Sequence, residues 1–321
     1  MNTIPQQSEL RALGALFFGA TCVSFAAIFV KLIEPLGMGP TAIGFWRTML
    51  GAVILFAATA ATRQRILMPW SVMRWTIAAG FLFFLDLYFW HKSILYCGAG
   101  MATILANTQV LATAVLGFFV FKERLGRRFA IAVLSAIGGV VLLIGIGSDV
   151  EFSSIYIRGV VLGLLTGVAY AHYLIVLKLA GHAREEVVRR STGQKGRVNY
   201  TAMIAWTSLF SALFLGIAAG VDANETMLPP GPRSFLYVAG LALVVQALGW
   251  WTISRSLPRV AASRGGLALL LQPVLATVWG YMFFGERLGL LQIVGAVVTL
   301  TAIYIGSVSQ KRAAVLPTEK G

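Results

Sequence analysis

The sequence predicts an all-α integral membrane protein, with ten transmembrane helices arranged as two inverted five-helix repeats. Three observations support this prediction. The chain of 321 residues is 58% hydrophobic and 12% charged, whereas soluble domains carry about 25% charged residues. Long apolar stretches follow one another along nearly the whole chain, and Lys and Arg gather in alternate connections. The second half also repeats a sequence pattern of the first at a shift of 163 residues.

Each predicted span is a mostly apolar stretch of about 20 residues, the length that crosses a bilayer as a helix. The runs are continuously apolar and long, which excludes a β-barrel of short alternating strands. Gly, Pro and charge clusters separate most of the spans. The predicted spans are 12–32, 41–61, 75–95, 100–121, 128–147, 159–179, 200–220, 234–254, 262–284 and 288–308.

The basic residues predict the orientation of the spans. With a cytoplasmic N-terminus, the inside segments hold 20 Lys and Arg and the outside segments hold 5. Cytoplasmic loops of membrane proteins collect Lys and Arg, so the net charge of +14 needs no nucleic-acid partner. We therefore expect a multi-pass protein of the cell inner membrane, with the N- and C-termini in the cytoplasm.

The shift of 163 residues aligns two segments of the chain. Residues 122–126 (KERLG) meet residues 285–289 (GERLG), and Gln109 falls on Gln272. Five spans per copy is an odd number, so the copies must face opposite ways, as in the inverted repeats of secondary transporters. The predicted domains are a first repeat at 11–147, a second at 159–308, a charged cytoplasmic linker at 181–199 and a cytoplasmic tail at 309–321.

Several short elements carry a family resemblance. They are Phe-Trp-Arg at 45–47, Leu-Asp-Leu-Tyr-Phe-Trp-His at 85–91, Ala-Thr-Ile-Leu-Ala-Asn at 102–107 and the two Glu-Arg-Leu-Gly elements. With them, the chain resembles the EamA-type ten-span transporters of the drug/metabolite transporter (DMT) superfamily over residues 11–308. The resemblance implies a helix bundle around a central cavity that exchanges small metabolites by alternating access. The linker 181–199 departs from the family pattern, because it is longer and more charged.

Members of this family include exporters of amino acids, drugs and amino-acid-derived metallophores, and some importers. We therefore expect a secondary active transporter that exports a small metabolite, with import in the same fold as the alternative. No Walker-type phosphate-binding motif is present, which favours proton or ion coupling over ATP. A channel would need a selectivity filter or rings of charge, which fits inverted repeats poorly.

An intramembrane enzyme is a remote alternative. Asp86 is the single Asp within a predicted span, and no H-E-x-x-H motif occurs. We expect no cofactor and no metal site, because the two cysteines lack metal-ligand spacing. The expected partners are a small-molecule substrate and the lipid bilayer, and the expected oligomeric state is a monomer or a homodimer.

Arg47 and Asp86 are the leading candidates for the substrate site. Ionisable side chains within a span are costly, so by default they are functional candidates. In one interpretation Arg47 fixes a substrate carboxylate or gates together with Asp86. In the other the two residues form a structural ion pair between spans two and three. The sequence leaves both interpretations open.

Other polar and aromatic residues within the spans are further candidates for the cavity or its gates. Polar amides in lipid must find partners, and aromatic rings can stack on a substrate ring or cation. A histidine can act as a protonation switch. The alternative roles are hydrogen bonding between helices and anchoring at the membrane interface. These candidates are Trp46, Tyr88, Asn107, Gln109, His172, Trp250 and Gln272.

Overall fold

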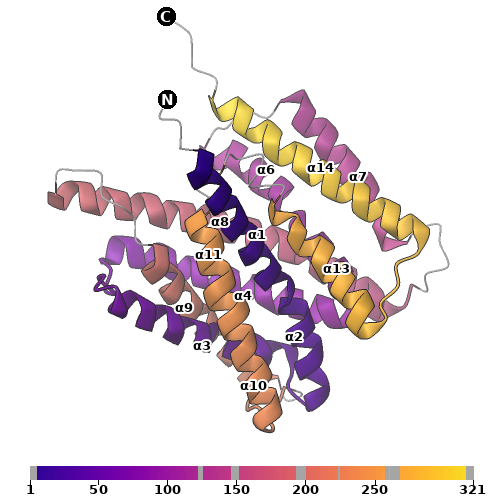
Figure 1. Ribbon diagram of the computed structural model, residues 1–321, viewed down its shortest axis with the longest axis horizontal. Helices are drawn as coiled ribbons and strands as arrows, with labels where there is room; N and C mark the ends of the chain where they lie inside the picture. Colours follow the sequence, from indigo (N-terminus) through magenta and orange to yellow (C-terminus); the bar gives the residue numbers. More distant parts are fainter. Residues whose placement is uncertain are drawn as a thin grey trace, which may run out of the picture.

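A computed structural model describes residues 6–121, 126–145, 152–192, 200–222, 225–256, 260 and 268–315. Across these ranges the chain folds into helices and contains no strand, as Figure 1 shows. The all-α membrane fold predicted from composition is therefore confirmed. The KERLG segment falls almost wholly outside the described residues, as does part of the linker.

Most helices coincide with the predicted spans. The first half of the chain forms α1 (Gln6–Ser24), α2 (Ala26–Ile33), η1 (Glu34–Leu36), α3 (Pro40–Ala61), α4 (Trp70–Cys97), α5 (Ala99–Asn107), α6 (Gln109–Phe121) and α7 (Arg127–Ile144). The second half forms α8 (Ser154–Thr192), α9 (Tyr200–Val221), α10 (Pro232–Gly240), the π-helix η2 (Leu241–Gly249), α11 (Trp250–Ser256), α13 (Leu271–Phe284) and α14 (Leu290–Val315).

In the described part of the chain, eight helical segments are long and apolar enough to cross a membrane. They lie at the first eight predicted spans. Two shorter apolar helices, Leu271–Phe284 and Leu290–Gly306, lie at the last two. The protein is thus a multi-pass membrane protein, while the count of ten crossings and the inverted repeat stay predictions.

Two predicted spans are interrupted at their middle. Span one breaks between α1 and α2, where Trp279 of α13 donates to Ser24 Oγ at 3.0 Å and stacks on Phe25. Span four breaks between α5 and α6, where Thr108 Oγ1 donates to the carbonyl of Leu105 at 2.6 Å. Ser and Thr bonds to the backbone compete with helix hydrogen bonding and bend helices. Each span is still a single helical segment of membrane-crossing length, Leu10–Leu36 and Ala99–Gly117.

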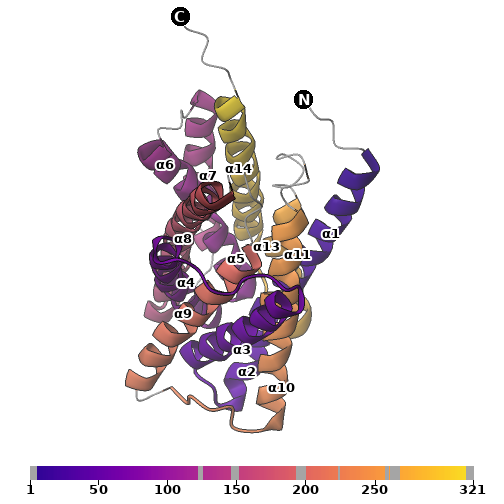
Figure 2. The same cartoon turned by 90° about the vertical axis from the view of Figure 1, so that its left-hand side faces the viewer.

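Glycines allow α7 and α14 to pack backbone to backbone. A Cβ added at Gly139 would lie 2.7 Å from the backbone nitrogen of Thr299. A Cβ at Gly295 would lie 2.3 Å from the backbone nitrogen of Leu143. Small residues bring membrane helices into close van der Waals contact, and the two helices lie side by side in Figures 1 and 2.

Two adjacent glycines of α7 give a matched test of this contact. Gly139→Ala is expected to lower the free energy of unfolding by about 1–3 kcal/mol, because the added methyl group overpacks the interface. Gly138→Ala is expected to cost nothing, because no atom lies within 4 Å of its Cβ position and Ala favours helices. Thermal unfolding in detergent checks this, and equal melting temperatures for the two variants would contradict it.

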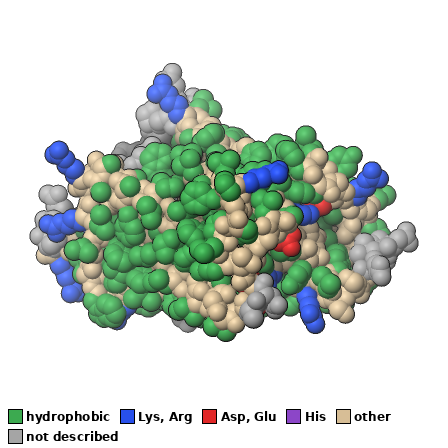
Figure 3. Space-filling view, turned by 90° about the horizontal axis from the view of Figure 1, so that it is seen from below, with side chains coloured by type: hydrophobic (Ala, Val, Ile, Leu, Met, Phe, Trp, Pro, Cys, Tyr) green, Lys and Arg blue, Asp and Glu red, His purple; other side chains and the backbone are tan. Residues whose placement is uncertain are grey.

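The surface agrees with a membrane environment. Figure 3 shows a face covered largely by hydrophobic side chains, with Lys and Arg mainly toward its margins. The first turn of α1 and the last turn of α14 point to the same side of the molecule in both ribbon views. This arrangement of α1 and α14 agrees with the even number of crossings that the sequence predicts.

Candidate functional site

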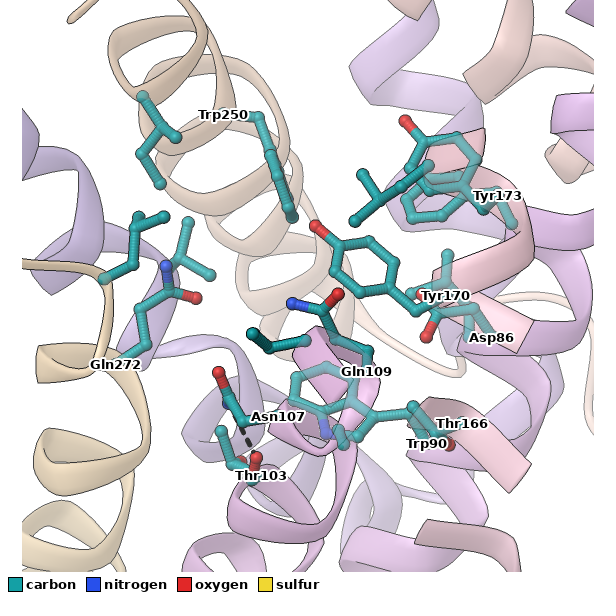
Figure 4. Close-up of a pocket in the computed structure, with 18 of the residues that line it drawn as sticks. Asp86, Trp90, Thr103, Asn107, Gln109, Thr166, Tyr170, Tyr173, Trp250 and Gln272 are labelled. Atoms are coloured by element: carbon teal, nitrogen blue, oxygen red, sulfur yellow. Dashed lines mark hydrogen bonds between the residues drawn. The ribbon is translucent and has the colours of Figure 1, made fainter. Parts of the chain in front are cut away.

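A cavity of about 360 Å³ lies within the helix bundle. The side chains that line it come from both halves of the chain, from helices α1, α3, α4, α5, α6, α8, α9, η2, α11, α13 and α14. Figure 4 shows Gln109 and Gln272 approaching the cavity from different helices, with Tyr170 and Trp250 close by. The predicted candidates that line it are Arg47, Asp86, Asn107, Gln109, Trp250 and Gln272.

Arg47 is buried in the bundle, 3% exposed. Its Nε donates to Gln246 Oε1 of η2 at 3.1 Å, and its guanidinium carbon lies 5.7 Å from the centroid of the Trp90 ring. Its Nη1 is buried and has no hydrogen-bond partner. The guanidinium is therefore fixed at one nitrogen and has an unused donor at another.

Asp86 is also buried, 7% exposed, and lines the same cavity from α4. Within the described residues no ion pair joins it to Arg47. This differs from the interpretation in which the two residues hold spans two and three together. An arginine and an aspartate thus line one cavity without a salt bridge between them, an arrangement suited to a ligand that carries both signs.

Aromatic rings form one side of the cavity. Tyr170 and Tyr173 of α8 stack at 5.6 Å between ring centroids, and Tyr173 stacks on Phe83 of α4 at 5.1 Å. Trp250 meets Tyr170 edge to face at 6.1 Å. Such rings offer a large apolar surface to an apolar or aromatic group.

The amide candidates lie where α5 gives way to α6 and at the start of α13. Asn107 Nδ2 donates to the carbonyl of Thr103 at 2.8 Å. Gln109 Oε1 accepts from Thr113 Oγ1 at 3.2 Å. Gln109 and Gln272, which align in the predicted repeat, line the same cavity from α6 and α13. Their amides can bind polar groups of a ligand.

Three predicted candidates do not line the cavity. Trp46 donates from Nε1 to the carbonyl of Met227 at 2.8 Å. Tyr88 accepts from Lys92 Nζ at 2.9 Å. His172 is exposed and contacts the carbonyl of Val168 on its own helix. The face of an apolar membrane helix cannot be read from its pattern, because lipid and protein surroundings are both apolar.

Two buried polar residues were absent from the predicted site. His91 is fully buried, and its Nδ1 lies 3.1 Å from the carbonyl of Pro40. Gln246 is 1% exposed and joins Arg47 to Ser208 of α9. Gln246 carries the signal used for Gln109, a polar amide within an apolar span. In the described part of the chain, no cluster of His, Cys, Asp or Glu could hold a metal ion.

Two carboxylates tie helices together at one end of the bundle. Glu286 pairs with Lys31 of α2 and accepts from the backbone nitrogen of Ala99 at the start of α5. Glu225 accepts from the backbone nitrogens of Thr41 and Ala42 at the start of α3. Negative charge is favourable at a helix N-terminus. We call this region, defined by Lys31, Thr41, Ala99, Glu225 and Glu286, the closed end.

The rate at which the native thiol of Cys97 is labelled measures access to the closed end. We expect Glu286→Ala to open it and to raise the rate at which maleimide labels Cys97, which is partly buried beside Gly98. Glu34→Ala, at an exposed carboxylate, is the control and should leave the rate unchanged. Mass spectrometry separates Cys97 from the buried Cys22. Unchanged Cys97 labelling in Glu286→Ala would show that Glu286 does not hold this end closed.

Comparison with known proteins gives concordant results. The EamA-like transporter family profile matches residues 10–145 and 157–308. An uncharacterized transporter of Bacillus subtilis is 26% identical in an alignment covering 90% of this chain and 92% of the relative. A protein of Escherichia coli named "Probable amino-acid metabolite efflux pump" is 28% identical, over 64% of this chain and 67% of the relative. A solved crystal structure at 18% identity, with a TM-score of 0.62, covers 94% of this chain and 98% of its own and shares the fold.

Proposed function

Since the chain belongs to the EamA-like transporter family, we propose that it is a secondary active transporter that exports an amino acid or an amino-acid derivative. In this proposal substrates enter the cavity from the cytoplasm and leave on the other side by alternating access of the two predicted repeats. The family match supports this assignment to transport. Metallophores and drugs that carry the same zwitterionic group belong to the same substrate class.

The observation that carries the proposal is that a basic and an acidic side chain line one cavity with no salt bridge between them. Arg47 and Asp86 both line it and form no ion pair with each other. A guanidinium binds a carboxylate through strong charge-assisted hydrogen bonds, and a carboxylate binds an ammonium group. A zwitterion satisfies both buried charges at once, which offsets the cost of burying them.

The aromatic side of the cavity and the amides complete the proposed site. Tyr170, Tyr173 and Trp250 provide the surface for an apolar or aromatic substrate side chain. Gln109 and Gln272 provide hydrogen bonds from the opposite helices. A ligand site built from apolar walls and a few polar groups is the usual design for small molecules.

The direction of transport rests on three supports. The predicted orientation puts the closed end outside, and the cavity extends away from that end, to Leu177 on α8 and Leu269 ahead of α13. A carrier in that state loads from the cytoplasm. Relatives at low identity are named as efflux pumps. Proton or ion coupling, the inner membrane and a monomeric or homodimeric state remain part of the proposal.

Untargeted mass spectrometry of cells and spent medium tests the proposal. A deletion strain is compared with the same strain carrying the wild-type gene, and with one carrying the Arg47→Ala variant. Export predicts a zwitterionic compound that accumulates inside the deletion strain and disappears from its medium, with no rescue by Arg47→Ala. A compound left in the medium and depleted inside would assign import. No difference among the strains would contradict both directions.

A further inference from the structure

Gln246 is the one side chain that hydrogen-bonds Arg47 within the described residues. It is 1% exposed and contributes both ends of its amide: Oε1 accepts from Arg47 Nε at 3.1 Å, and Nε2 donates to Ser208 Oγ at 3.1 Å. An arginine can only donate, so the oxygen must face Arg47 and the amide orientation is fixed. Ser208 is fully buried on α9. The amide is thus held between two helices.

The backbone on both sides of the Gln246–Arg47 contact has features that allow the two side chains to meet. The segment Leu241–Gly249 is π-helical, a rare geometry that occurs frequently at functional sites. On α3, Gly51 lies one turn beyond Arg47, and a Cβ there would lie 2.4 Å from Gln246 Cγ. Any side chain at position 51 would displace Gln246. The π-helical segment and the glycine surface of α3 thus pack together at the point where Gln246 contacts Arg47.

The chemistry of an amide partner differs from that of a carboxylate. A Glu or Asp beside Arg47 would satisfy the same nitrogen and also cancel its charge. Gln246 satisfies Nε and leaves the charge in place. Trp90, the ring over which the guanidinium lies, likewise attracts a cation without neutralising it. Arg47 keeps a buried Nη1 without a hydrogen-bond partner.

We propose that Gln246 is a positioning residue, which orients Arg47 for a substrate carboxylate and, as a neutral partner, preserves the positive charge that binds it. The inference rests on the proposed function and goes further, because it assigns carboxylate selectivity to the pair Arg47–Gln246. It also gives the π-helical segment a role, which is to bring this amide to α3. Ser208 fixes the other end of the amide.

The test uses purified full-length protein and two probes of nearly equal shape, phenylacetate and phenylacetamide. A ligand that binds the folded state raises the melting temperature. Wild type is expected to be stabilised by phenylacetate and far less by phenylacetamide. Gln246→Glu keeps a hydrogen-bond acceptor for Arg47 Nε. The new carboxylate also forms an ion pair with the positive charge of Arg47. This variant is expected to weaken the apparent affinity for phenylacetate by about 10- to 100-fold, the range for one lost charge-assisted hydrogen bond, with little change for phenylacetamide.

Gln292→Glu is the matched control. Gln292 is another buried glutamine, 5% exposed, whose amide bonds to backbone atoms of Gly289 and Leu143 away from the cavity. The Gln292→Glu variant should alter the stability of the protein without altering its preference for phenylacetate over phenylacetamide. Ser208→Ala, which frees one end of the amide without adding charge, should weaken phenylacetate binding less than Gln246→Glu does.

A purely structural role predicts the reverse order, because Gln246→Glu would strengthen the contact with Arg47 and leave ligand preference unchanged. Equal stabilisation of wild type and Gln246→Glu by phenylacetate would therefore overturn the inference. So would a wild type that does not distinguish the two probes. Probe binding and cellular export are measured separately, so carboxylate selectivity without amino-acid export would contradict the proposed function alone.

Discussion

Replacement of Arg47 with Ala is expected to reduce transport of a carboxylate-bearing substrate by about 100-fold, the upper range for losing a hydrogen bond to a charged group. The physical reason is that Arg47 is a buried cation in the cavity to which no carboxylate of the described residues is paired. Nothing in the described cavity can take over its charge. Initial rates in inverted membrane vesicles measure the loss.

Arg47→Lys should rescue little of this activity. A lysine keeps the charge but lacks the planar guanidinium, which donates to Gln246 from Nε and lies over the ring of Trp90. Arginine and lysine are not equivalent at such sites. Arg74→Ala, at an exposed arginine of α4, is the control and should transport normally. Wild-type rates in Arg47→Ala would remove Arg47 from the site.

Asp86→Asn is expected to have an effect of similar size, again about 100-fold. The substitution keeps the shape of the side chain and removes its carboxyl group, so the cavity loses the acidic group that it holds together with Arg47. Two roles for Asp86 predict different losses. If Asp86 binds the substrate ammonium group, both net transport and exchange of labelled for unlabelled substrate fall.

If Asp86 instead carries a coupling proton, Asp86→Asn should abolish transport driven by a pH gradient and leave exchange intact. We expect the first result, because Asp86 lines the cavity with Arg47. Asp222→Asn, in which the carboxylate near Lys92 is neutralised, is the matched control and should retain both activities. Full activity of Asp86→Asn in both assays would exclude either role.

Much of the fold could be predicted from the sequence because lipid imposes a simple rule. Every span needs about 20 apolar residues, and this places a helix at each predicted span, although α8 continues well past its predicted end and α13 begins later than predicted. The breaks near Phe25 and Thr108 could not be predicted. They depend on one or two side-chain contacts, such as that of Trp279 with Ser24. The π-helical segment around Gln246 is a local feature of the same kind and could not be predicted either.

The candidate site could be predicted in part, for a related reason. A charge or amide in an apolar span avoids lipid, so Arg47, Asp86 and Gln272 were recognisable as interior residues, and they line the cavity. His172 carries the same signal, yet it is exposed and its ring contacts the carbonyl of Val168 on its own helix. No pattern in the sequence distinguishes a polar side chain that lines the cavity from one that bonds to the backbone of its own helix.

Substrate exchange by the purified protein in proteoliposomes tests directly whether the cavity selects zwitterions through Arg47. Each proteinogenic amino acid is offered in turn, together with its amide and its deaminated acid, to wild type and to Arg47→Ala. We predict that wild type exchanges at least one zwitterion and exchanges the amide and the deaminated acid of that compound far more slowly, and that Arg47→Ala loses the exchange. Exchange of the amide as fast as of the parent amino acid, or equal exchange by both proteins, would contradict it.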